Sequence, residues 1–395
     1  MPEQTHFDLV IGGAGISSLL LGYELSKTKK VLIIEANDDL PQNKYWVTLK
    51  DCVDTNPFLK PFVDTSFNTM DFSDAYQNVF TLNGDYILWD TNGLTMFLKE
   101  QITKNNGIIR YNQRFCSYKI TGNQINIFAN ENCYATKLFI DCMGYNSPLI
   151  LAKDLIKFKG HYLLYGAKLK LRESIKPICL SNVMLHKHPK YFEVFPTSNG
   201  EVFATMIYPT KSIVDMKGLE ADFNYITTNS IYSKYFEKDS KVSNLWGVVP
   251  VGTIKRKALD KIFFFGESAQ SNPAATGTCL TRLLLNYKRV AGFINLKIAE
   301  DDLSEKSLSA YPEVLNPFIR DLQLYAFKDI LSWNSDRFAK FISIVDHVDH
   351  DLINKFLFGS LLPKDILTLK HMTSLINPKK IFLSKPLLQT LLKFT

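Results

Sequence analysis

Cysteine is scarce in this chain, and the few cysteines show no paired spacing. The 395 residues include six cysteines, and no two of them form a C-x-x-C pair. This pattern excludes a small fold held together by disulfides. We expect reduced, mostly buried thiols in a protein of a reducing compartment, at Cys52, Cys116, Cys133, Cys142, Cys179 and Cys279.

Long runs of one residue type are also missing. No stretch reaches eighteen apolar residues, so the sequence predicts no membrane-spanning helix. The net charge of +7 is spread without a long basic run, so nucleic acid is not an expected partner. No basic segment precedes the apolar run at Phe7, which is therefore interpreted as a first strand and not a signal peptide. We expect a cytoplasmic protein.

The most informative segment is Phe7–Ala36. An apolar strand, Phe7–Gly12, is followed by a glycine-rich turn, an apolar helix over Ile16–Leu25 and a second strand, Val31–Ile34. This βαβ unit contains G-x-G-x-x-S, with an acidic residue about twenty positions further on, and it predicts a dinucleotide site. Gly13 permits the turn, Gly15 lets the backbone approach a pyrophosphate, and the helix N-terminus offers amides to it. The predicted cofactor-binding residues here are Gly13, Ala14, Gly15, Ser18 and Glu35, whose carboxylate suits ribose hydroxyls.

A second segment, Ile262–Ala291, predicts the other half of the site. A buried strand over Lys261–Gly266 leads into a loop and then a long helix over Ala275–Ala299. In open α/β sheets, ligands bind beyond the carboxyl ends of the strands. A carboxylate there suits a ribitol hydroxyl, and the loop can offer amides to a flavin carbonyl. The predicted residues are Gly266, Glu267, Pro273, Thr276 and Gly277.

The overall pattern predicts an α/β fold, with a Rossmann-like domain, an interleaved antiparallel-sheet domain and a helical C-terminal region. We assign the dinucleotide domain to residues 1–160 and 240–300, the antiparallel-sheet substrate domain to 161–239, and the helical region to 301–395. The sequence alternates in the manner of β-strands between Tyr162 and Pro209. The polar segment Asn37–Asn78 is predicted to be a long functional loop or irregular structure.

The two motifs resemble those of the FAD-dependent oxidoreductases that include lycopene cyclases, geranylgeranyl reductases, aromatic hydroxylases and flavin-dependent halogenases. Gly13–Ser18 is similar to their fingerprint, and Gly266–Gly277 to their late motif. Within the group, Asn272–Leu284, including Arg282, and Asp336–Leu367 are most similar to lycopene cyclases. The resemblance implies bound FAD and a large hydrophobic substrate, isoprenoid or polyene-like, with NAD(P)H open as an electron donor.

Four departures from the family patterns bear on the choice between possible functions. Glu267 stands where the family usually has Asp, and no paired acids occur in Val202–Ser212, where lycopene cyclases carry them. Met143 precedes Gly144 where aromatic hydroxylases have Asp, and the W-x-W-x-I-P motif of halogenases is absent. The alternatives are hydride transfer to a double bond, cyclisation, an aromatic monooxygenase or halogenase-like activity, and a flavin-binding protein without catalysis.

Glu193 is the candidate proton donor for a cyclase-like reaction. Because side chains of a strand point alternately to its two faces, Glu193 shares a face with Tyr191 and Phe195. If that face lines a cavity, the carboxyl is desolvated and favours its proton-donating form; if not, it points to solvent. Trp46 is a further candidate at the flavin, or a core aromatic.

Two weaker patterns concern metal ions and membranes. His347 and His350 lie three apart, as metal ligands can, but a solvated helix face explains them better, and we predict no metal. The basic, apolar tail suits either peripheral contact with anionic lipid or a final packed helix; its lysines are Lys364, Lys370, Lys379, Lys380, Lys385 and Lys393.

Overall fold

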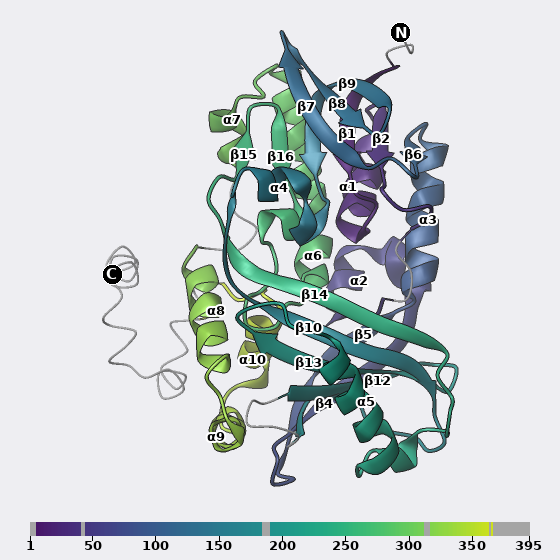
Figure 1. The fold of residues 1–395 in the computed structure, drawn as a ribbon, viewed down its shortest axis with the longest axis vertical. Coiled ribbons are helices and arrows are strands. Elements are labelled where there is room, and N and C mark those ends of the chain that lie inside the picture. The colour runs from purple at the N-terminus through teal and green to yellow at the C-terminus, as the bar shows by residue number, and fades with distance from the viewer. Residues whose placement is uncertain (1–4, 41–43, 184–189, 312–316, 363–364, 366–395) are drawn as a thin grey trace.

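The computed structural model describes residues 5–40, 44–183, 190–311, 317–362 and 365. These residues form two large sheets, which lie one above the other in Figure 1. Helices pack against both sheets, and the elements of each sheet come from several separated parts of the chain.

The first sheet is built on parallel strands in the order β16–β9–β1–β2–β6. Its central strands are short apolar runs, and every residue of Val31–Ile34 is buried, as expected of parallel strands covered on both faces. The five strands are β1 (Thr5–Gly12), β2 (Val31–Ile34), β6 (Ile108–Arg110), β9 (Asn132–Asp141) and β16 (Ile262–Phe264). Antiparallel pairing adds β7 (Phe115–Thr121), β8 (Gln124–Ala129) and β15 (Ala258–Leu259).

Helices cover one face of this sheet and a hairpin covers the other. The helical face is formed by α1 (Ile16–Ser26), α3 (Thr91–Lys104) and α6 (Leu280–Ala299), whose buried side chains share one core with Leu9 and Ile11 of β1. On the opposite face, Val10 and Leu32 pack with the β7–β8 hairpin and with α4 (Pro148–Ala152). The predicted α/β class with a Rossmann-like parallel sheet is confirmed.

The second sheet has the order β14–β10–β13–β12–β11–β4–β5–β3. Neighbouring strands are antiparallel except for β11 and β4, which pair in parallel. The strands are β3 (Val47–Leu49), β4 (Val63–Ser73), β5 (Val79–Trp89), β10 (Ile156–Lys170), β11 (Ile178–Val183), β12 (Lys190–Pro196), β13 (Glu201–Thr210) and β14 (Ser243–Ile254).

The two faces of the second sheet have different cover. α5 (Lys217–Asn229) packs on one face through Leu219, Phe223 and Ile226. The other face carries the C-terminal helices α8 (Pro317–Ile330), α9 (Ser335–Val345) and α10 (His350–Leu357), seen beside the lower sheet in Figure 1. The remaining short helices are α2 (Asp51–Thr55), η1 (Pro57–Phe62), η2 (Gly144–Asn146), η3 (Ser233–Tyr235), η4 (Gly266–Ala269) and α7 (Glu305–Ser309).

Several sequence-based boundaries differ from the structure. The second sheet extends beyond 161–239, because β3, β4, β5 and β14 belong to it, and β3 and β4 occupy much of the expected polar loop. Two irregularities in the pairing of β4, between Val63 and Thr65 and between Phe67 and Thr69, interrupt its alternation of polar and apolar residues, so the sequence does not show the period-two pattern of a strand. α6 begins at Leu280 and not at Ala275, because Gly277 has a positive φ of 73° and ends the preceding loop.

The C-terminal region is helical as far as it is described. α7 to α10 lie within it, whereas the six tail lysines fall outside the described residues. Among the described helices, none combines the length and apolarity needed to cross a bilayer.

Candidate active site

The glycine turn after β1 has the shape that a dinucleotide requires. Gly13 has a φ of 85°, and a Cβ there would lie 2.9 Å from the carbonyl oxygen of Cys142. At Gly15, by contrast, a Cβ would have no described atom within 4 Å, and Gly15 lines a large cavity. α1 begins directly after Gly15. The turn therefore leaves an open cradle at a helix N-terminus, where a phosphate is stabilised.

Ser18 lies behind this cradle. It lies in the first turn of α1, is fully buried, and does not line the cavity. A small side chain at this third motif position allows the helix to pack closely on the sheet.

Glu35 lies at the end of β2 and lines the same cavity. Its Oε2 accepts a hydrogen bond from the Ala14 amide at 2.7 Å, and its Oε1 accepts from the Asn37 amide at 2.9 Å and from Asn37 Nδ2 at 2.7 Å. The carboxylate is thus held at the turn, in the place where the motif predicts contact with the adenosine ribose.

Replacement of Glu35 by alanine is expected to weaken FAD retention about tenfold or more, because charge-assisted hydrogen bonds to the ribose and to the turn are both lost. Equilibrium dialysis of the loaded protein measures this. The control is Glu24→Ala. Glu24 lies in the last turn of α1, and its carboxylate pairs with Lys27 at the end of the same helix. Equal FAD retention in the Glu35→Ala and Glu24→Ala proteins would contradict the role given to Glu35.

The late loop reaches the same cavity from β16. Gly266 has a φ of 70°, and Glu267 follows it as a cavity-lining residue. Burial raises the pKa of the Glu267 carboxyl, while the Asn272 amide and the Lys44 ammonium partly oppose this. Thr276 and Gly277 also line the cavity, whereas Pro273 closes the turn by accepting from the Gly277 amide at 2.7 Å.

Asp141 joins the two motifs, a role that its position at a strand end does not reveal. It ends β9, which pairs with both β1 and β16. Its buried carboxylate accepts from Ser147 Oγ at 2.5 Å and from Ser268 Oγ at 2.9 Å. Burial raises its pKa to about 6. Asp141 thereby fixes the late loop against the chain segment that follows β9.

The C-terminal helices hold the late loop from the other side. Gln323 of α8, fully buried, accepts from the Ala275 amide at 2.8 Å and donates to the Phe356 carbonyl at 2.5 Å. The hydroxyls of Thr276 and Thr278 both donate to the carbonyl of Leu357, at 2.6 and 3.0 Å. Only the folded chain brings Gln323 and the loop together.

Gln323→Leu is therefore expected to loosen the loop. It removes the partners of the buried Ala275 amide and of the partly buried Phe356 carbonyl while nearly preserving side-chain volume, at a cost of about 2 kcal/mol. We expect faster FAD release and a changed visible flavin spectrum. Gln323→Glu keeps an acceptor for the Ala275 amide, so its release rate and spectrum should be closer to those of the parent protein. An unchanged spectrum and release rate in Gln323→Leu would show that the loop does not depend on this contact.

The cavity extends from the glycine turn to the second sheet and has a volume of about 670 Å³. At its far end, the walls are largely apolar and aromatic. The residues at this end include Met70, Tyr162, Leu164, Phe195, Ile207, Leu245 and Phe358, whereas Trp46, which also lines the cavity, packs against the core of the first sheet. Such a cavity suits a large hydrophobic ligand.

Glu193 lines this far end, so the face of β12 that it shares with Tyr191 and Phe195 is the one that lines the cavity. Its Oε2 accepts from the Tyr45 hydroxyl at 2.6 Å. Burial raises the pKa of the Glu193 carboxyl to about 8, and the Tyr45 hydrogen bond lowers it in part. The carboxyl is thus mostly protonated near neutral pH and can donate a proton.

Lys44 also lines the cavity. Its Nζ donates to the Trp246 carbonyl at 3.3 Å, and it also lies 5.7 Å from the centre of the Trp246 ring. Burial lowers the pKa of the Lys44 ammonium, and the Glu267 carboxylate opposes this shift.

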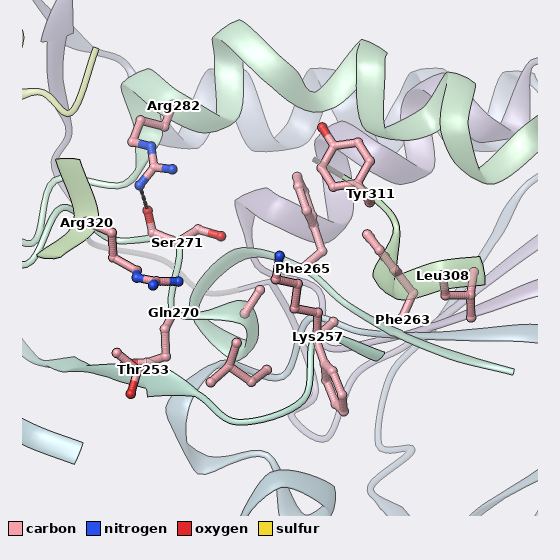
Figure 2. Close-up of a pocket in the computed structure, with 13 residues that line it drawn as sticks. Thr253, Lys257, Phe263, Phe265, Gln270, Ser271, Arg282, Leu308, Tyr311 and Arg320 are labelled. Carbon is pink, nitrogen blue, oxygen red and sulfur yellow. Dashed lines mark hydrogen bonds between the residues drawn. The ribbon is translucent and has the colours of Figure 1, made fainter. Parts of the chain in front are cut away.

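Arg282 contributes outside the large cavity. Figure 2 shows it beside a second, smaller hollow of about 80 Å³, where its Nη1 donates to the Ser271 carbonyl at 2.5 Å. It ties the start of α6 to the late loop.

The two histidines considered as metal ligands have different surroundings. His350 accepts from the Asn83 amide at 2.9 Å and packs against Phe80, whereas His347 is exposed. Within the described part of the chain, no group of three or more potential metal ligands occurs.

Comparison with known proteins identifies the fold. No protein-family model and no curated protein sequence matches this chain. A geranylgeranyl bacteriochlorophyll reductase-like protein of Thermoplasma acidophilum has a similar structure, with a TM-score of 0.74 and 14% identity over 94% of this chain and 96% of that one. The p-nitrophenol 4-monooxygenase PnpA of Pseudomonas putida has a TM-score of 0.73 and 13% identity, over 91% of this chain and 100% of its own.

A third similar structure was solved with its cofactor. The halogenase PltM, as an L111Y mutant in complex with FAD, has a TM-score of 0.68 and 12% identity, over 97% of this chain and 93% of its own. At these identities the likeness concerns the fold. The chain therefore has the fold of FAD-dependent oxidoreductases.

Proposed function

We propose that this chain binds FAD and is an enzyme. The support is the fit of the residues to the cofactor. The open space beside Gly15 and the α1 N-terminus suit a pyrophosphate, and Glu35 is positioned for a ribose. Glu267 and the amides of the late loop suit the ribitol and the flavin ring.

The proposed substrate is a large hydrophobic molecule, isoprenoid or polyene-like. The single observation that carries this proposal is the continuity of one cavity from the glycine turn to the apolar walls around Glu193. Bound FAD would supply hydride chemistry there, or act without net redox change in a lycopene cyclase-like cyclisation. Glu193 would donate a proton to the substrate, and the surrounding aromatic rings would exclude water and stabilise positive charge by cation–π contact.

The second candidate is an NAD(P)H-dependent aromatic monooxygenase or a halogenase-like flavoprotein. The similar structures of a monooxygenase and of halogenases favour it. Met143 before Gly144 remains a difference from the hydroxylase pattern, and the electron donor is open under both candidates.

Two measurements separate these functions. The first is the carotenoid pigment profile of a lycopene-producing host that expresses the chain, in which a cyclised or more saturated product supports the first proposal. The second is NADPH oxidation by the purified protein with and without aromatic compounds. Strong stimulation by an aromatic compound, together with an unchanged pigment profile, would overturn the first proposal in favour of the second.

A further inference from the structure

A small polar cluster interrupts the apolar wall at the far end of the cavity. It consists of Tyr45, which precedes β3, Glu193 of β12 and Thr205 of β13, and all three line the cavity. Glu193 and Thr205 are direct partners in the register of β12 and β13, so their side chains share one face. A polar cluster on an apolar wall orients a ligand.

The Tyr45 side chain is fixed in place. Its ring stacks on Phe203, with centroids 5.4 Å apart, and lies 5.9 Å from the Phe195 ring. Its hydroxyl donates to Glu193 Oε2. Among the described residues, no hydrogen bond reaches the other carboxyl oxygen, Oε1, so Glu193 presents one open oxygen to the cavity.

Thr205 adds a second incompletely bonded group. Its hydroxyl is buried and forms no hydrogen bond of good geometry within the described chain, although it lies close enough to Tyr45 to influence that residue's pKa. The hydroxyl lies beside Gly166 of β10, where a Cβ would approach Thr205 Oγ1 to 2.9 Å. A glycine there lets the backbones of β10 and β13 approach closely beside Thr205.

We propose that this cluster binds a neutral hydroxyl group, so that among ligands with the same hydrophobic skeleton the cavity prefers an alcohol or a phenol to the hydrocarbon. This inference rests on the cavity assigned to the substrate under the proposed function. Burial favours the protonated Glu193 carboxyl, which donates to a ligand oxygen. A hydroxyl satisfies Oε1 in either protonation state, because it can both donate and accept.

Other ligand groups fit less well. A hydrocarbon leaves the Glu193 oxygen and the Thr205 hydroxyl without partners once water is excluded. An ether can accept from Glu193 but cannot donate. A carboxylate placed against Glu193 would disfavour ionisation of either group in a desolvated site.

Binding of four matched probes tests the proposal. Calorimetry with the full-length holoprotein at pH 7 compares 2-naphthol, 2-methoxynaphthalene, naphthalene and 2-naphthoate. We expect 2-naphthol to bind about tenfold more tightly than naphthalene and more tightly than the other two, as one additional good hydrogen bond provides. Glu193→Leu and Thr205→Val should each reduce the preference for 2-naphthol over naphthalene.

The control variant is at Glu220 of α5, the helix that packs on the opposite face of the same sheet. There Tyr165 donates to Glu220 Oε1 at 2.5 Å, outside the cavity, so Glu220→Leu should keep the preference. Near-ultraviolet circular dichroism shows whether each variant is folded. If the Glu193→Leu protein is not folded, the nearly isosteric Thr205→Val variant provides the test.

Three results would overturn the inference. They are equal affinity for naphthalene and 2-naphthol, tightest binding of 2-naphthoate, which would indicate recognition by Lys44, and an undiminished preference in both cavity variants. FAD content, measured by absorbance in the same samples, reports on the proposed function separately. A protein that retains FAD but shows no preference contradicts the hydroxyl site alone.

Discussion

Gly15→Val is expected to abolish FAD binding while the apoprotein stays folded. Gly15 has φ and ψ of −73° and 174°, an extended conformation that valine adopts without strain. No described atom lies within 4 Å of the added Cβ, so the methyl groups project into the cavity where the pyrophosphate would lie. We expect a loss of affinity of at least about 100-fold, because the backbone can no longer approach the phosphates.

The matched control is Gly292→Val on the exposed side of α6. A Cβ at Gly292 also has no described atom within 4 Å, but Gly292 does not line the cavity. Fluorescence titration with FAD and thermal unfolding of both apoproteins are the measurements. A fully loaded, yellow Gly15→Val protein would contradict the location of the site.

Glu193→Gln is expected to remove the proton donor and to lower turnover at least about 100-fold, the usual contribution of a positioned general acid. In the parent enzyme, the rate should fall as the pH rises through about 8, because the carboxyl loses its proton there. Glu220→Gln, in the equivalent Tyr–Glu pair on the other face of the sheet, should leave turnover unchanged. A fully active Glu193→Gln protein would show that the proton comes from elsewhere.

The same variant gives a readout that needs no substrate. The Glu193 pKa is about 8 in the folded protein against an ordinary value of 4.5, so the folded state binds the proton more tightly. The free energy of unfolding therefore falls as the pH rises from about 4.5 through 8. Glu193→Gln should lose this part of the pH dependence and gain about 3 to 4 kcal/mol relative to the parent between pH 5 and pH 8. Parallel pH profiles for parent and variant would show that Glu193 is not desolvated.

The sequence predicted the local parts of this fold. The β1–α1–β2 unit is local in sequence. Gly13 and Gly15 form the turn after β1, and Glu35 at the end of β2 accepts a hydrogen bond from that turn. Strict alternation placed Glu193 on the same face of β12 as Tyr191 and Phe195. Those predictions needed no information on distant contacts, whereas the face that lines the cavity is decided by the packing of the whole sheet.

The unpredicted parts depend on contacts between distant segments. β4 pairs in parallel with β11, more than 100 residues later, and nothing in its own sequence specifies that partner. Tyr45 meets Glu193 across 148 positions, and Gln323 meets Ala275 across 48. The predicted start of the helix at Ala275 is wrong, because Gly277 has a left-handed φ of 73° and α6 begins only at Leu280.

The central claim is that the open cradle at Gly15 and the late loop hold FAD. The most direct test is the visible absorbance spectrum of the purified protein after incubation with FAD and removal of free cofactor by gel filtration. We predict a flavin spectrum at about one FAD per chain in the parent protein, and none in Gly15→Val. A parent protein that leaves the column without flavin, although folded, would contradict the account.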